Sequence, residues 1–256
     1  MKLHAFHGGG ERATMSIFDP FDPEVGKIVD IPYFFYLIEH PQGLVLFDSG
    51  GHPSLIDTPR DRLGSAADAF ELVMRPGDDV VSQLALVGVK PGDVGHVAHS
   101  HLHYDHAGGV EFFPDAEFYV QRSELEFARN PPVYQRDIYI PADFEHPVRW
   151  REIDGDHDIF GDGRLVLFPT PGHTRGHQSL LVHLEGRVVI LVADAAYLPR
   201  NLTERTLPAI VWSPDAMVAS WERIEQLARS EGAELIFTHD LAWPETTRVA
   251  PGSFYE

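Results

Sequence analysis

Cysteine is absent from this chain of 256 residues. Without thiols the chain forms neither disulfide bonds nor thiolate metal sites, which excludes zinc fingers and cysteine-held iron–sulfur clusters. Any metal must therefore be held by nitrogen and oxygen atoms. Long apolar runs are also missing, since no stretch reaches the roughly 18 residues of a membrane span, and the opening MKLHAFHGGG lacks the apolar segment of a secretory signal. We therefore expect a cytoplasmic protein with no membrane partner.

Basic residues are scarce as well. The chain has 20 lysines and arginines against 39 aspartates and glutamates, a formal net charge of −19. This charge repels polyphosphates and anionic membrane surfaces, so nucleic acid is not an expected partner. The 43% hydrophobic content is ordinary for a chain that buries a core. Because no low-complexity linker or break in composition divides the chain, we expect a single domain over residues 1–256.

Segments with strand and helix patterns alternate along the chain. The stretch YFFYLIEHPQGLVLFDSG has two apolar runs around Pro41–Gly43, which predicts a hairpin that delivers Asp48 to a loop. Apolar spacing and capping residues predict helices over 80–87 and 214–231. The run ELIF then predicts a buried strand that ends just before Thr238 and His239. Strands that lead into loops carrying His or Asp are typical of an α/β fold with its site at the strand ends.

One stretch, AHSHLHYDHAGG at residues 98–109, crowds four histidines and an aspartate into eight positions. Taken alone, such a tract could be a disordered metal scavenger, a purification remnant or part of a shaped site. At a strand end, His101 and His103 would point the same way, and the following turn can bring Asp105 and His106 to a neighbouring position. The spacing therefore predicts two half-sites for metal ions.

Two metal ions about 3.5 to 4 Å apart need some six to eight ligands, so this tract alone is insufficient. Further candidates follow apolar runs: His173 in LVLFPTPGHTRGH, Asp194 in VVILVADAAY and His239 in LIFTHD. His99 and His177 are near these motifs but outside them. The remaining histidines are expected to be solvated or hydrogen-bonded: His4, His7, His40, His52, His96, His146, His157 and His183.

These residues resemble the metallo-β-lactamase superfamily and, more narrowly, its N-acyl-homoserine lactone lactonases. The matching pieces are LVLFDSG, SHLHYDHAGG, TPGHTRGHQSL, ADAAY and THD, in the family's order over most of the chain. The resemblance implies an α/β fold, an αββα sandwich of two mixed β-sheets flanked by helices, with a dinuclear zinc site at one edge. Cobalt or iron are the implied substitutes for zinc. The implied ligands are His101, His103 and His173 for one ion and Asp105, His106 and His239 for the other, with Asp194 bridging them.

The implied activity is a metal-dependent hydrolase that opens the lactone ring of N-acyl-homoserine lactones. Two ions that share one hydroxide lower the pKa of bound water from about 15.7 towards about 7, so a metal-bridging hydroxide can attack the ester carbonyl. The resemblance implies that the Tyr197 phenol points to the carbonyl oxygen. Asp105 is then expected to pass the proton to the leaving alkoxide. We expect Asp48 to accept a hydrogen bond from a ligand imidazole. Gly108 and Gly109 are expected to serve backbone geometry.

Other enzyme classes share the metal motif. A glyoxalase-type thioesterase would carry a basic C-terminal region, but only DLAWPETTRVAPGSFYE remains from Asp240 onward. A nuclease needs a basic groove, which the net charge opposes. A β-lactamase lacks the bridging aspartate, and a diiron oxidoreductase has Glu at the His103 position and a fused flavodoxin domain. A non-catalytic binding module would not retain every ligand.

The lactone itself is left open by the sequence, with γ-butyrolactone or pyridoxolactone types as alternatives. We expect selectivity to depend on loops within residues 8–25, 52–77 and 130–150, the segments least readable by pattern. The oligomeric state also stays open, a homodimer included. Aromatic residues in or near these loops are candidates for an apolar pocket wall, although such residues more often belong to the core: Phe18, Phe21, Phe70, Tyr104 and Tyr134.

Overall fold

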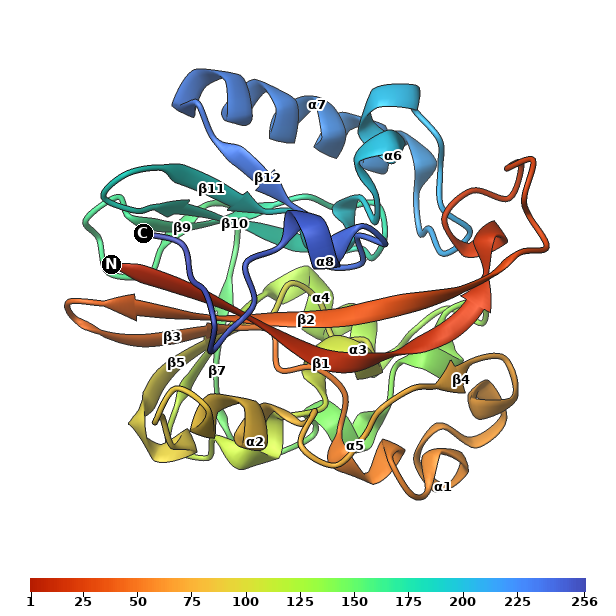
Figure 1. The fold of residues 1–256 in the computed structure, drawn as a ribbon, viewed down its shortest axis with the longest axis horizontal. Helices are drawn as coiled ribbons and strands as arrows, with labels where there is room; N and C mark the ends of the chain where they lie inside the picture. Colours follow the sequence, from red (N-terminus) through yellow and green to blue (C-terminus); the bar gives the residue numbers. More distant parts are fainter.

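The computed structural model describes residues 1–256. Two β-sheets pack face to face, and helices cover the outer side of each sheet (Figure 1). Both sheets contain parallel and antiparallel strand pairs. The predicted αββα sandwich of two mixed sheets is therefore confirmed. None of the helices is long and apolar enough to cross a membrane.

The larger sheet has seven strands in the order β4-β1-β2-β3-β5-β6-β7. Strands β1, β2 and β3 form an antiparallel meander, whereas β3, β5, β6 and β7 run parallel. The predicted hairpin is present, because His40 pairs with Gly43 where β2 meets β3. The strands are β1 (Lys2–Thr14), β2 (Ile28–His40), β3 (Gly43–Phe47), β4 (Glu71–Leu72), β5 (Val94–Ala98), β6 (Glu117–Gln121) and β7 (Arg149–Ile153).

The smaller sheet has five strands in the order β12-β11-β10-β9-β8. Only the pair β11 and β12 is parallel in this sheet. The two ends of the chain lie side by side (Figure 1), where Leu3 forms a bridge with Tyr255. The strands are β8 (His157–Asp158), β9 (Leu165–Pro169), β10 (Gln178–His183), β11 (Val188–Leu191) and β12 (Glu234–Ile236).

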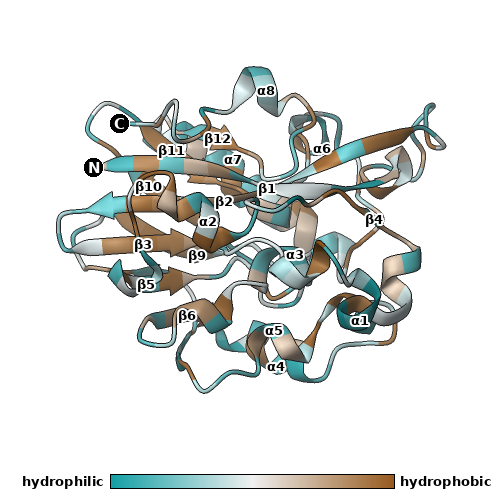
Figure 2. Ribbon diagram, turned by 60° about the horizontal axis from the view of Figure 1, so that its bottom comes forward, coloured by the Kyte–Doolittle hydropathy of each residue, from teal (hydrophilic) through white to brown (hydrophobic).

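Strand β2 shows why both faces of the larger sheet are buried. Its side chains alternate with the period of two that a strand imposes. Tyr36 and Ile38 enter the core between the sheets. Phe35 and Leu37 point the other way, into a core beneath helices α2 (Val80–Ala85) and α4 (Arg122–Arg129). Figure 2 shows the result: the strands are mainly hydrophobic, while the connecting loops are mainly hydrophilic.

Helices cover the outer faces of the sheets, and capping residues visible in the sequence mark where they begin and end. Helix α2 begins where the Asp79 side chain accepts a hydrogen bond from the Ser82 backbone N–H. Helix α7 begins after the N-cap Ser213 and ends at Gly232, which adopts the left-handed conformation (φ 64°). Both predicted helices are thus present. The helices are α1 (Pro59–Leu63), α2 (Val80–Ala85), α3 (Tyr104–Ala107), α4 (Arg122–Arg129), α5 (Pro141–Phe144), α6 (Pro199–Glu204), α7 (Pro214–Glu231) and α8 (Trp243–Thr246).

Candidate metal centre

The structure brings all of the predicted ligands together at one edge of the sandwich. Each lies in a segment that follows a strand: β5, β9, β11 or β12. Their side chains are almost fully buried, except that of Asp105, which is 15% exposed. We call these residues the His/Asp cluster: His101, His103, Asp105, His106, His173, Asp194 and His239.

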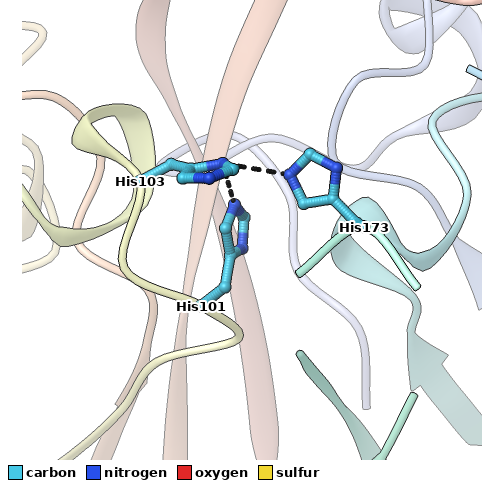
Figure 3. A group of neighbouring side chains, drawn as sticks. All are labelled: His101, His103 and His173. Atoms are coloured by element: carbon cyan, nitrogen blue, oxygen red, sulfur yellow. Dashed lines mark hydrogen bonds between the residues drawn. The ribbon is translucent and has the colours of Figure 1, made fainter. Parts of the chain in front are cut away.

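Three imidazoles from two loops form the first half-site. His103 Nδ1 lies 3.0 Å from His101 Nε2 and 3.0 Å from His173 Nε2 (Figure 3). The rings meet almost at right angles, at 84° for His101 with His103 and 80° for His103 with His173. The rings therefore do not stack, and their nitrogen atoms converge on one point, as the ligands of one ion do.

The second half-site combines two imidazoles with one carboxylate. Asp105 Oδ2 lies 3.3 Å from His106 Nε2 and 3.6 Å from His239 Nε2. Helix α3 begins after His103, and this turn swings Asp105 and His106 away from the direction of the residues before it. The two half-sites expected from the spacing of the motif are thus present as groups of converging atoms.

Asp194 lies between the half-sites and presents one carboxylate oxygen to each. Its Oδ2 is 3.3 Å from His173 Nε2 and 3.9 Å from His101 Nε2. Its Oδ1 is 3.3 Å from His106 Nε2 and 3.2 Å from His239 Nε2. This is the arrangement required of a carboxylate that bridges two ions.

The outer nitrogens of two imidazoles determine which tautomer each ring adopts. His173 Nδ1 lies 3.0 Å from the carbonyl oxygen of Ile210, and His239 Nδ1 lies 2.7 Å from that of Pro32. A carbonyl oxygen only accepts hydrogen bonds, so both Nδ1 atoms must carry the proton and donate it. In the neutral rings, Nε2 is then unprotonated and directs its lone pair into the cluster.

The same argument holds for His101 and His106. The carboxylate of Asp48 accepts hydrogen bonds from the Ser100 hydroxyl, at 2.8 Å, and from His106 Nδ1, at 3.0 Å. Because the Ser100 hydroxyl donates to Asp48, its oxygen accepts from His101 Nδ1 at 3.0 Å. In their neutral forms, both rings therefore also present an unprotonated Nε2 inward. The predicted contact between Asp48 and a cluster imidazole is confirmed.

The inner atoms of the cluster fit a divalent cation. Unprotonated nitrogens and carboxylate oxygens are all acceptors, so they cannot satisfy one another. His106 Nε2 and Asp194 Oδ1 are indeed buried without a hydrogen-bond partner. Buried acceptors without donors are costly, and a cation relieves that cost. The all-nitrogen-and-oxygen donor set agrees with a site for zinc-like ions.

The carboxylates around the cluster favour a positive charge at the second half-site, which a proton on His106 or a bound cation can supply. Burial disfavours the charged form of His106, but Asp105, Asp194 and Asp48 outweigh burial and raise its pKa well above the ordinary value. Burial and neighbouring imidazoles hold the pKa of His101 and His103 well below that value. The negative potential is thus concentrated where Asp105 and Asp194 face the second half-site.

The backbone around the cluster is held in unusual conformations. Asp48 and Ala193 have φ of 60° and 48°, a region that costs residues other than glycine energy. The Ser100 backbone N–H, 2.7 Å from Asp48 Oδ1, helps to hold the first of these. A Cβ at Gly108 would lie 2.2 Å from the backbone nitrogen of His52. The expectation that Gly108 serves backbone geometry is confirmed, because the close approach excludes any side chain.

Two buried residues that the sequence left outside the site brace it. His177 Nε2 accepts a hydrogen bond from the Asp194 backbone N–H at 3.0 Å. The Glu124 carboxylate accepts from the Leu102 N–H at 3.0 Å and from the Thr174 hydroxyl at 2.6 Å, so it joins the two loops that carry the first half-site. The nearby GH repeat in TPGHTRGH was a signal for His177, whereas nothing local marked Glu124.

Tyr197 borders the pocket that opens over the cluster. Its hydroxyl lies 3.3 Å from His173 Nδ1, whose proton is already directed outward, so the phenol oxygen serves as a second acceptor. The phenol's own proton is then free for a ligand. Burial and the charge of Asp194 raise the pKa of Tyr197 well above its ordinary value, which keeps that proton in place.

The rest of the pocket wall comes largely from the three predicted loop segments. Ile17 and Phe18 come from residues 8–25, Phe70 from 52–77 and Ile138 from 130–150. Tyr104 is a further wall residue, as expected. The expectation was wrong for Phe21 and Tyr134, whose side chains project into solvent and are 93% and 60% exposed. Their loops turn them away from the pocket, an orientation that composition alone does not reveal.

Comparison with known proteins gives the same result as the geometry. The family model of the metallo-beta-lactamase superfamily matches residues 30–239. The N-acyl homoserine lactonase AttM of Azorhizobium caulinodans is 38% identical over 236 residues, which cover 90% of this chain and 89% of that protein. AiiA of Bacillus thuringiensis subsp. kurstaki, also an N-acyl homoserine lactonase, is 31% identical over 228 residues, or 88% of each chain.

The fold agrees with a solved structure over nearly its whole length. That structure is an N-acyl homoserine lactone hydrolase with the product N-hexanoyl-L-homoserine bound at its catalytic metal centre. The two superimpose with a TM-score of 0.89 and 28% sequence identity, covering 99% of this chain and 98% of the other. The chain therefore belongs to the metallo-β-lactamase superfamily, and it is similar to the N-acyl homoserine lactonases within it.

Proposed function

We propose that this protein is a metal-dependent lactonase that opens the ring of N-acyl-homoserine lactones at a dinuclear zinc centre. The observation that carries the proposal is Asp194, which presents one oxygen to each of two groups of unprotonated imidazole nitrogens. The similarity to N-acyl homoserine lactonases over about nine-tenths of the chain supports the substrate class. Residues 1–256 act as one domain, because side chains of both sheets share the core between them and loops of both sheets contribute to the site.

The His/Asp cluster would hold two ions. One would be bound by His101, His103 and His173, and the other by Asp105, His106 and His239. Asp194 would bind both ions. Two divalent ions supply a nucleophile from water at neutral pH, because they lower the pKa of water from about 15.7 towards about 7, and they polarise an ester carbonyl. Imidazole and carboxylate ligands suit zinc, and cobalt or iron can replace it.

Two side chains of the pocket carry out the proton and charge steps. The Tyr197 hydroxyl donates a hydrogen bond to the lactone carbonyl oxygen, and this interaction strengthens as negative charge develops there. Asp105, the most exposed cluster residue, takes the proton from the attacking water at a carboxylate oxygen and delivers it to the departing ring oxygen. The product is a hydroxy acid.

The leaving group explains why the ring opens and the side-chain amide survives. A ring alkoxide can be protonated by Asp105 as it departs, whereas the resonance-stabilised amide has a poorer leaving group. The apolar part of the pocket, with Phe18, Phe70 and Ile138 in its wall, suits the acyl chain. A small lactone of the γ-butyrolactone type or an aromatic one of the pyridoxolactone type would leave much of this wall uncovered.

Mass spectrometry of metal-replete protein with N-hexanoyl-L-homoserine lactone tests the proposal. Ring opening adds one water to the intact molecule and releases one proton per turnover. Amidase action would instead release hexanoic acid and homoserine lactone. A panel of acyl-chain lengths, with γ-butyrolactone and pyridoxolactone added, measures the selectivity. Efficient cleavage of a thioester or phosphodiester with every lactone inert would overturn the lactonase assignment while leaving the metal site intact.

A further inference from the structure

One acidic side chain in the pocket, Glu11, takes no part in the proposed metal centre. It belongs to strand β1 and is only 5% exposed. It lines the pocket over the cluster together with Tyr104, Asp105 and His239. A carboxylate in such a place is costly unless it is paired, so its partners are informative.

Two phenols hold the Glu11 carboxylate in one orientation. The Tyr33 hydroxyl donates to Oε2 at 2.6 Å, and the Tyr104 hydroxyl donates to the same oxygen. Because both donors use Oε2, the lone pairs of Oε1 remain for a further donor. An ionised carboxylate is the form that accepts two such hydrogen bonds best.

The charges that act on Glu11 belong to the pocket over the cluster. Burial and the charge of Asp105 raise the pKa of Glu11 to about 7, although the two phenols and His239 act to lower it. Glu11 also borders a second cavity, which Arg75 and Asp78 line. Neither of these charged residues is among the main influences on its pKa. The charged residues that act most on Glu11, Asp105 and His239, therefore line the pocket over the cluster.

Glu11 stands out against the remainder of the wall. Apart from the cluster residues and the two tyrosines, the other lining side chains are all apolar: Ile17, Phe18, Ile31, Phe70, Ile138 and Ile210. A few placed polar groups in an apolar pocket fix a ligand's orientation. A pocket built to pair with a polar group of its substrate rejects analogues that lack the group, because its own polar atom is then left unpaired.

We infer that Glu11 determines specificity: its Oε1 accepts a hydrogen bond from the side-chain amide N–H of an N-acyl-homoserine lactone. This inference rests on the proposed function. The amide nitrogen is attached to the ring carbon next to the lactone carbonyl, so the N–H reaches the wall close to the reacting centre. Glu11 lines the same pocket as Asp105 and His239, which belong to the metal centre. The enzyme thus selects lactones that carry an N–H donor next to the ring.

A matched pair of substrates tests this contact. N-hexanoyl-homoserine lactone and α-hexanoyloxy-γ-butyrolactone have the same size and differ in N–H against O. At about pH 8, above the Glu11 pKa of about 7, we expect the wild type to favour the amide by about tenfold to a hundredfold in kcat/KM, mainly through KM, as a hydrogen bond to a charged acceptor predicts. Glu11→Gln should abolish the preference, because the phenols retain the amide oxygen and turn an NH₂ group towards the substrate. Glu11→Asp should keep part of it.

Binding gives a readout that does not depend on turnover. The lactam analogues of the two lactones resist opening, so calorimetry compares their affinities for the wild type and for Glu11→Gln. Tyr33→Phe removes one donor from Oε2 but leaves Oε1 in place, so the substrate preference should persist in that variant. The exposed Glu71 supplies the matched control, and Glu71→Gln should behave as wild type.

The outcomes separate the two proposals. If the wild type binds both lactams equally, or Glu11→Gln keeps the preference for the N–H, the specificity inference is overturned. If Tyr33→Phe loses the preference as fully as Glu11→Gln does, Glu11 serves structure rather than recognition and the inference also fails. If the wild type opens neither lactone, the proposed function fails, and the calorimetric comparison still decides the role of Glu11.

Discussion

Groups of histidines lie at both ends of the larger sheet. The two groups differ in whether the atoms opposite their imidazole nitrogens can form hydrogen bonds with them. The His/Asp cluster lies beyond the ends of β3 and β5. The second group, which we call the hairpin cluster, consists of His40, His96, Tyr119 and Phe160 and surrounds the turn where β3 begins. Both groups are rich in imidazole, and only the first contains three or more side chains whose ligand atoms converge.

In the hairpin cluster the imidazole nitrogens meet partners of the opposite role. His40 Nδ1 accepts a hydrogen bond from the Gln42 backbone N–H at 3.1 Å, and its Nε2 donates to Asp162 at 3.0 Å. Its ring also stacks on Phe160, with centroids 4.2 Å apart. In the His/Asp cluster the inner atoms face other acceptors. A high density of histidine therefore does not make a metal site; convergent lone pairs without donors do.

The largest expected effect comes from breaking this convergence. Wild-type protein grown with ample metal should contain about two zinc-like ions per chain, and His106→Ala should lose the ion of the second half-site and nearly all activity. His239→Ala should act in the same way. Elemental analysis of the purified proteins measures the metal content. One ion or none in the wild type would contradict the dinuclear proposal, and equal metal loss in His40→Ala would remove the distinction between the two clusters.

At the metal centre, two conservative variants separate the role of Asp105 in ligation and proton transfer from the role of Tyr197 in charge stabilisation. Asp105→Asn should lower kcat/KM by at least about a hundredfold, because it removes a proton carrier and a carboxylate ligand together. Tyr197→Phe should cost only about tenfold, because the phenol supplies one of two interactions with the carbonyl oxygen. Steady-state kinetics at matched metal content compares them. If Tyr197→Phe abolished turnover with its metals intact, the assigned roles would be reversed.

The cluster could be predicted from the sequence because its signals are local. Each member is a His or Asp in a loop segment that follows an apolar run, and the absence of cysteine leaves few other ligand types. The same holds for helix α7, whose start and end are set by Ser213 and Gly232. Strand ends and caps depend on neighbouring residues, so one chain segment suffices to read them.

Contacts between distant segments could not be predicted in this way. Glu11 reaches Tyr104 across 93 positions, and Glu124 joins loops on both sides of the site. The sequence shows a charge inside a strand pattern at Glu11, but its partners exist only once β1 packs beside β2 and α3. The direction of the Phe21 side chain likewise depends on how its loop folds, which is why the prediction that it lines the pocket was wrong.

His99 lies next to the metal motif but outside the cluster, and it tests whether its local environment sets its protonation. It is fully buried, and burial lowers its pKa from 6.5 to about 4. Between these values the unfolded chain binds more protons than the folded one, so the contribution to stability is complete above 6.5 and is lost as the pH falls towards 4. Between about pH 7.5 and about pH 5, this residue should account for a loss of about 2 kcal/mol.

Urea unfolding of metal-free wild type and His99→Gln at both pH values isolates this term. The glutamine does not titrate, so the free energy of unfolding should fall less in the variant on acidification. Metal-free protein is used because protonation of the His/Asp cluster would otherwise compete with bound ions. Parallel pH dependence in the two proteins would mean that His99 is accessible to protons in the folded state.

The smallest effect is expected in the hairpin cluster, where His40→Ala should change stability and nothing else. The substitution removes the stacking on Phe160 and leaves Asp162 and the Gln42 N–H without their partner. Asp162 is partly exposed and can turn to water, so the loss should be about 1 to 2 kcal/mol. Urea unfolding midpoints measure the loss, while metal content and kcat/KM should stay at wild-type values. Because His40 ends β2 and pairs with Gly43 at the start of β3, and Asp48 directly follows the end of β3, any fall in metal content would show that strand β3 transmits disturbance between the two clusters.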